Sequence, residues 1–66
     1  MNEATFTYLF LGQEWHTGRL PTTHDTAQAF AQQLASIPLK KPTDEIRVWF
    51  GPVDGREPDA VARRAN

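Results

Sequence analysis

The sequence predicts an α+β fold: a small sheet of three to four mainly antiparallel strands in β-β-α-β order, with one amphipathic helix packed on one face. Aromatic and β-branched residues alternate near the N-terminus and again over residues 45–50, which is typical of strands. A central segment has apolar residues at helical spacing. Because no linker or internal repeat divides the chain, residues 1–66 are expected to form a single domain.

The sheet is expected to begin at residues 4–11, ATFTYLFL, where aromatic residues alternate with threonine and leucine. Gly12-Gln13 suits a two-residue type II′ turn, because glycine supplies the positive φ of the first central position. A second strand, residues 14–20, follows this turn and ends at Pro21.

That turn fixes the register between the first two strands. The expected cross-strand pairs are Phe10 with Trp15, Tyr8 with Thr17, and Leu9 with His16. A longer turn would shift the register by one residue and exchange the faces of the second strand. The assignment of side chains to faces therefore depends on the turn.

Residues 24–36 are predicted to form the amphipathic helix. Its apolar residues at helical spacing are Ala27, Phe30, Ala31 and Leu34. Thr23 or Asp25 can cap the free amides at its start, and Asp25 with Gln28 makes a capping box. Pro38 ends the helix, because the residue before a proline is disfavoured in the α region.

A third strand is predicted over residues 45–50. The turn signal Asp54-Gly55 after it favours a short returning edge strand over residues 56–58. The last residues, 57–66, are expected either to fray or to form a short C-terminal helix, since Pro58 suits a first helical turn.

One helix covers one face of a sheet, so the other face is expected to be open. If Ile46 and Val48 face the helix, alternation places Arg47 and Trp49 on the opposite side. The open face is then expected to carry Leu9, Leu11, His16, Arg47 and Trp49. In the alternative, the segment around Val61 folds back over Trp49 and makes this face a second core.

Charge and composition exclude several classes of protein. Seven lysines and arginines against eight acidic residues give a formal net charge of -1, which lacks the basic excess of proteins held by phosphate contacts. There are no cysteines, and the residue pattern predicts neither a targeting segment nor a membrane-spanning one. A cytoplasmic protein is therefore expected.

No pattern of catalytic or metal-ligating residues stands out. The potential metal ligands closest in sequence are Glu14, His16, His24 and Asp25, whose histidines do not share one element at a ligand spacing. The one serine, Ser36, has no histidine predicted beside it. We expect no enzyme activity, no metal and no cofactor.

The features that remain favour binding to another protein. From Thr26 to Leu39 the chain has no charged residue, so the predicted helix offers a neutral, glutamine-rich surface. Tryptophan and arginine, which the open face combines, are enriched in interface hot spots. We expect a protein-binding module whose anchor is Trp49, with Arg47 orienting the partner and Leu9, Leu11 and His16 completing the contact. The partner is another protein or a second copy of the chain.

The alternative is a module that binds single-stranded nucleic acid. Aromatic residues on a small sheet can stack bases, and basic residues beside them can hold phosphates. The residues expected for this function are Trp15, Arg19, Lys40, Lys41 and Arg47.

The size and the hairpin, helix, strand order resemble those of small phage-encoded inhibitors, such as those that block host RNA polymerase or CRISPR complexes. The likeness is one of architecture and includes no shared motif. It implies a small regulator or inhibitor that occupies a site on a larger cellular machine.

Overall fold

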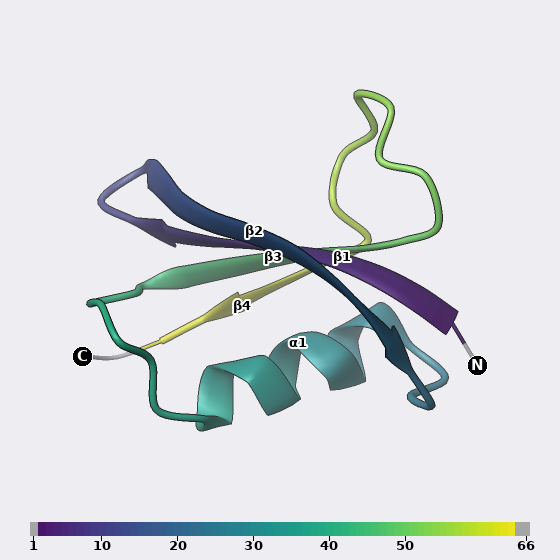
Figure 1. Ribbon diagram of the computed structural model, residues 1–66, viewed down its shortest axis with the longest axis horizontal. Helices are drawn as coiled ribbons and strands as arrows, with labels where there is room; N and C mark the ends of the chain where they lie inside the picture. The colour runs from purple at the N-terminus through teal and green to yellow at the C-terminus, as the bar shows by residue number, and fades with distance from the viewer. Residues whose placement is uncertain (1, 65–66) are drawn as a thin grey trace.

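The computed structural model describes residues 2–64, which form a four-stranded antiparallel sheet with one helix. The elements are β1 (Asn2–Phe10), β2 (Gln13–Thr22), α1 (Ala27–Ser36), β3 (Glu45–Phe50) and β4 (Ala60–Arg63). The strands lie in the order β2-β1-β3-β4. Figure 1 shows α1 below the sheet and the loop between β3 and β4 above it. The predicted small α+β fold, with one helix on one face of the sheet, is confirmed.

The hydrophobic core lies between α1 and the sheet. Its buried side chains are Ala4, Phe6, Tyr8, Ala27, Phe30, Ala31, Leu34, Ile46, Val48, Ala60 and Ala62. The helix packs against β3 and β4, where the alanines of β4 leave room for it to approach closely. Burial of these apolar side chains supplies most of the free energy of folding.

Beside the helix, the side chains over β1 and β2 are mainly aromatic. The Tyr8 ring lies 5.3 Å from the Trp15 ring and 5.6 Å from the His16 ring, centroid to centroid. The Phe6 ring lies against Gly18, where an added Cβ would be 2.6 Å from the Phe6 Cζ atom. A side chain at position 18 would therefore force the Phe6 ring to move.

The predicted hairpin register is wrong. Phe10 pairs with Gln13, and the two turn residues, Leu11 and Gly12, both have positive φ (51° and 79°), as a type I′ turn requires. An irregularity then shifts the pairing between Tyr8 and Leu9 and leaves one extra residue in β2.

Long-range contacts account for this turn. The Leu11 backbone N–H donates a hydrogen bond to the Asp44 carboxylate (3.1 Å), which holds the turn against the loop before β3. The indole N–H of Trp15 donates to the Thr43 hydroxyl (3.1 Å) in the same loop. Both contacts join positions about thirty residues apart. Turn preferences depend only on neighbouring residues, so they do not include such contacts.

The first and last residues of β2 and α1 differ from those predicted. β2 continues through Pro21 to Thr22, because an edge strand tolerates a residue without a backbone N–H. The helix begins at Ala27, and its N-cap is Thr26, whose hydroxyl accepts a hydrogen bond from the Ala29 N–H (3.1 Å). Neither Thr23 nor Asp25 is the cap. The chain first turns at Thr22, whose hydroxyl accepts a hydrogen bond from the His24 backbone N–H.

The end of the described chain is a strand. β4 pairs antiparallel with β3, so the alternative of a short C-terminal helix is wrong. The predicted return over residues 56–58 is also displaced, because those residues belong to the loop and pairing starts at Ala60. β4 extends the edge of the sheet instead of folding over Trp49. Residues 65 and 66 lie outside the described chain.

Candidate protein-binding surface

The open face is the side of the sheet opposite α1. It is formed by the side chains of Glu3, Thr5, Thr7, Leu9, Glu14, Thr17, Arg19, Pro21, Glu45, Arg47, Trp49, Val61 and Arg63. No helix covers it in the part of the chain that the structure describes (Figure 1). Leu9, Arg47 and Trp49 of the predicted contact set lie here.

Two residues of the predicted contact set do not lie on the open face. Leu11 is in the hairpin turn, where its side chain is 77% exposed. His16 lies opposite Tyr8 on the helix side of the sheet and stacks on its ring. Both corrections follow from the type I′ turn, which includes Leu11, and from the bulge, which changes the face on which the residues of β2 from His16 onward lie.

The centre of the open face is closed to a partner. Leu9 is only 4% exposed, and Thr5 and Thr7 are also buried. Thr5 lies between Arg19 on β2 and Trp49 on β3, whose longer side chains shield it. Contact with a partner therefore falls to the side chains that flank β1.

Trp49 is the largest of these flanking side chains. It is half-buried, and its indole N–H donates a hydrogen bond to the Arg56 carbonyl oxygen (3.0 Å). This bond orients the ring against the loop of residues 51–59, which rises on the same side of the sheet (Figure 1). Trp49 is thus both accessible and fixed in position.

The loop of residues 51–59 is held by Arg56, which sequence reasoning did not select. Its guanidinium donates to the carbonyl oxygens of Pro52 (2.8 Å) and Phe50 (2.9 Å) and pairs with the Asp59 carboxylate (3.3 Å). Asp59 also accepts from the Phe50 backbone N–H (2.8 Å). A signal was present in the sequence, since an Arg and an Asp three residues apart follow the predicted Asp54-Gly55 turn.

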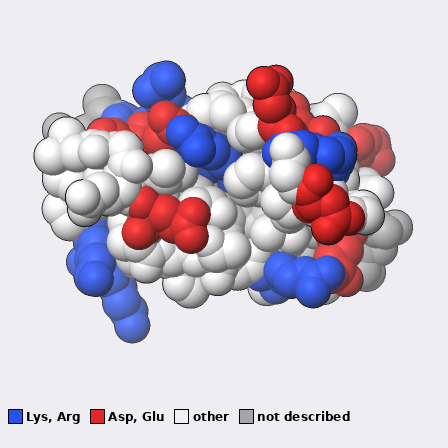
Figure 2. All heavy atoms as spheres, turned by 90° about the horizontal axis from the view of Figure 1, so that it is seen from above, with Lys and Arg blue, Asp and Glu red and all other residues white. Residues whose placement is uncertain are grey.

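Most of the charges of the open face are paired with one another. Glu45 bonds to Arg47 and lies 3.5 Å from Arg63, and Arg19 lies 2.8 Å from Glu3. Seen from the side opposite α1, basic and acidic residues are interspersed among uncharged ones (Figure 2). This surface therefore has no single-sign field that would attract a strongly charged partner.

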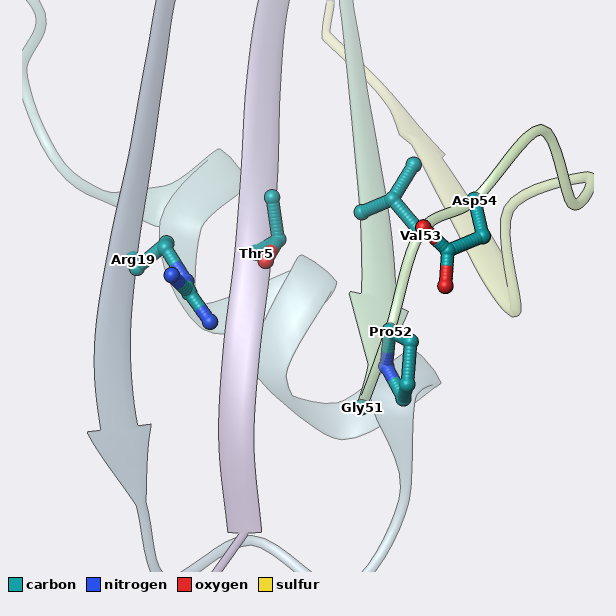
Figure 3. A pocket seen from close by; sticks show the side chains of 6 residues that line it. All are labelled: Thr5, Arg19, Gly51, Pro52, Val53 and Asp54. Carbon is teal, nitrogen blue, oxygen red and sulfur yellow. The ribbon is translucent and has the colours of Figure 1, made fainter.

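Two grooves border the loop of residues 51–59. The first has a volume of about 370 Å³ and is lined by Thr5, Arg19, Gly51, Pro52, Val53 and Asp54. Figure 3 shows Arg19 on one side of it and the loop side chains on the other. The second, of about 570 Å³, is lined by Glu45, Arg47, Glu57, Pro58, Val61 and Arg63. Both grooves are open to solvent at the base of the loop.

The residues expected for nucleic-acid binding do not form one surface. Trp15, Lys40 and Lys41 lie on the helix side, where the Lys41 ammonium is 5.6 Å from the centre of the Trp15 ring. Arg19 and Arg47 lie on the open face, and each is paired with a carboxylate. The five side chains cannot contact one strand of nucleic acid on a single face.

The histidines are likewise separated. His24 precedes α1, where it packs against Phe30 and hydrogen-bonds to Gln33 of the helix. His16 lies on β2. Within residues 2–64, no group of three or more His, Asp or Glu side chains lies close enough together to hold a metal ion.

The phenol of Tyr8 has a shifted pKa. Burial raises the pKa of the Tyr8 phenol above its ordinary value of 10.0, and the nearby Arg64 guanidinium opposes part of this rise. Tyr8 lies in the core under the aromatic cluster, so the shift reflects packing and not a reactive site.

Comparison with known proteins found no match for this chain. Over residues 2–64, no helix has the length and apolar composition needed to cross a membrane. No protein-family model matches the chain, and no curated protein or solved structure is significantly similar to it.

Proposed function

We propose that this protein is a non-enzymatic protein-binding module that contacts a larger partner through Trp49 and the loop beside it. The position of Trp49 carries the proposal: the ring is half-buried on a face without a helix and is fixed by its hydrogen bond to Arg56. An aromatic ring that is already held in place loses little conformational entropy when a partner covers it.

The arginines of the open face support the same function. Arg47 is held by Glu45, so its guanidinium is oriented before any partner arrives. The grooves at the base of the loop can receive side chains of the partner on either side. Trp49 would supply most of the affinity, and the paired charges would supply orientation and specificity.

We further propose that the protein acts in the cytoplasm as a regulator or inhibitor that occupies a site on a larger assembly. The small, cysteine-free chain and its likeness in architecture to phage-encoded inhibitors support this role. A rigid surface formed by few residues suits an inhibitor, because binding requires little reorganisation.

The test is to capture partners from lysate of the source cells with tagged wild-type protein and with Trp49→Ala, in the presence of nuclease, and identify them by mass spectrometry. A partner retained by the wild type is then purified and its affinity measured. If Trp49 is the anchor, the folded Trp49→Ala protein binds roughly thirtyfold more weakly or worse, as hot-spot residues do.

A control and a second variant keep this test decisive. Ile37→Ala removes an exposed apolar side chain beyond the end of α1 and should leave the affinity unchanged. Arg47→Met keeps the aliphatic stem of Arg47, and should weaken binding even if Trp49→Ala proves unstable. Unchanged affinity in folded Trp49→Ala and Arg47→Met proteins would refute the proposal.

The second candidate function is single-strand nucleic-acid binding at the helix side. It is favoured by one observation: Lys40 lines a groove of about 420 Å³ together with the Trp15, His16 and Tyr8 side chains, and the Lys41 ammonium lies over the Trp15 ring. A fluorescent oligothymidine is the probe. Binding that weakens steeply with salt and with Lys41→Ala, but not with Trp49→Ala, would replace the first proposal.

A further inference from the structure

The outer edge of β2 has no neighbouring strand within residues 2–64. β2 runs from Gln13 to Thr22, whereas the other edge strand, β4, has only four residues, Ala60–Arg63. The outward N–H and C=O groups of an edge strand can pair with a strand of another molecule. β2 is therefore the longer of the two edges available for such pairing.

The charged side chains of β2 are arranged symmetrically along it. Glu14 and Arg19 both point to the open face, and Thr17 lies between them. Along β1, the pairs on this face are Thr5 with Arg19, Thr7 with Thr17, and Leu9 with Glu14. Counted along β1, the residues opposite Arg19 and Glu14 each lie two positions from Thr7, the residue opposite Thr17.

The bulge produces this symmetry. Because Trp15 is the extra residue of β2, Glu14 lies opposite Leu9 instead of one position further along β1. In an antiparallel pair of identical strands related by a two-fold axis, positions at equal distances from the axis face each other. An axis through Thr17 therefore places Arg19 of each copy opposite Glu14 of the other.

We propose that two copies of this chain form a homodimer by antiparallel pairing of their β2 edges about Thr17, with two ion pairs between Arg19 and Glu14. An axis at Gly18 would place Arg19 opposite Thr17, and an axis at His16 would move Arg19 past the end of the paired strand, so neither forms the ion pairs. Charge complementarity thus selects one register, with a second copy as the partner.

Other features of β2 fit the same register. Pairing over residues 13–20 stops before Pro21, which lacks the N–H that further pairing would need. On the helix side, Gly18, which has no side chain, lies opposite His16 of the second copy. Leu20, which is 46% exposed, is brought near Trp15 of the second copy and loses solvent contact.

Dimerisation has two consequences for the molecule. A chain of 66 residues has a small core, and burial of a second edge adds stability that the monomer lacks. The two sheets become continuous, with both helices on one side and both open faces on the other. The proposal does not rest on the function of Trp49, which lies on β3 and is not part of the paired edge.

Sedimentation equilibrium of the purified protein over a range of concentrations tests the dimer. We expect a wild-type dimer whose dissociation constant rises about tenfold or more in Arg19→Glu and in Glu14→Arg, since each change puts like charges opposite each other. The double variant, Arg19→Glu with Glu14→Arg, should restore the wild-type constant. An equimolar mixture of the two single variants should also dimerise, because each then meets the opposite charge.

The controls separate this dimer from other effects. Arg63→Glu makes the same charge change on β4, at a similarly exposed side chain, and should leave the dimer unchanged. Trp49→Ala should do the same, and circular dichroism checks that every variant is folded. A wild-type protein that remains monomeric up to about 1 mM, or a dimer that ignores both charge reversals, would overturn the proposal.

Discussion

On the helix side of β3, Ile46 and Val48 are fully buried among hydrocarbon side chains, whereas on the open side of the same strand Arg47 and Trp49 are half-buried and hydrogen-bonded. One face is stabilised by removal of apolar area from water, which has no directional requirement. The other is held by directional bonds whose net contribution to stability is small.

The comparison of the faces separates folding from recognition. A side chain that is fully buried contributes to stability but has no surface for a partner, as Leu9 shows even on the open face. Trp49 keeps part of its ring exposed, and the bond to Arg56 limits its movement. Substitutions on the helix face should therefore act mainly on stability, and those around Trp49 mainly on binding.

The largest effect is expected from Ile46→Ala. Ile46 is 0% exposed at the centre of the core, so truncation leaves a cavity and should lower the free energy of unfolding by about 2–5 kcal/mol. In a domain this small, such a loss removes a large part of the total free energy of unfolding. Urea denaturation followed by circular dichroism measures it. A loss below about 1 kcal/mol would mean that the helix face is not the main source of stability.

A matched exchange of valine and threonine compares the faces directly. Val48→Thr puts a hydroxyl into the apolar core and should cost about 1–3 kcal/mol. Thr7→Val, on the open face, removes one bond to the Thr17 hydroxyl, which still donates to Glu14, so its effect should stay within about 1 kcal/mol. Urea denaturation of both variants gives the two values. Equal costs would remove the energetic distinction between the faces.

The smallest effect concerns pH and the aromatic part of the helix face. Because the pKa of Tyr8 is raised on folding, its contribution to stability is fully present below about pH 10 and is lost as the pH rises through the folded pKa. Tyr8→Phe lacks this ionisation, so its stability should decline less above about pH 10 than that of the wild type. Urea midpoints of both proteins at neutral and alkaline pH measure the difference. Parallel declines would show that Tyr8 is not buried in the core.

The paired strand β4 could have been predicted from the sequence only in part, because its conformation depends on pairing with β3. Ala60 and Ala62 are buried and Val61 and Arg63 are exposed, a period of two that the sequence shows only weakly because Val61 is also apolar. Pro58 and the nearby charges favoured a helix start instead, but the turn at Asp54-Gly55 already returned the chain toward β3. Pairing with β3 then decided the conformation, since tertiary contacts override weak local preferences.

The hairpin turn could not have been predicted in the same way. A non-glycine residue is rarely found at positive φ, yet Leu11 adopts it because Asp44 accepts a hydrogen bond from its backbone N–H. The bulge beside it places His16 on the helix side and sets the positions of Glu14 and Arg19 along the edge. These features depend on the loop before β3, which is distant in sequence.

The sequence by itself determined the α+β class, the limits of β3 and the position of Arg47 and Trp49 opposite the core, because the alternation of side chains in a strand is a local property. Only the tertiary structure decided the register of β2, the strand at the C-terminal end and the loop bonds that fix Trp49. The physical reason is that these depend on hydrogen bonds and packing between distant segments, whose geometry no local pattern contains.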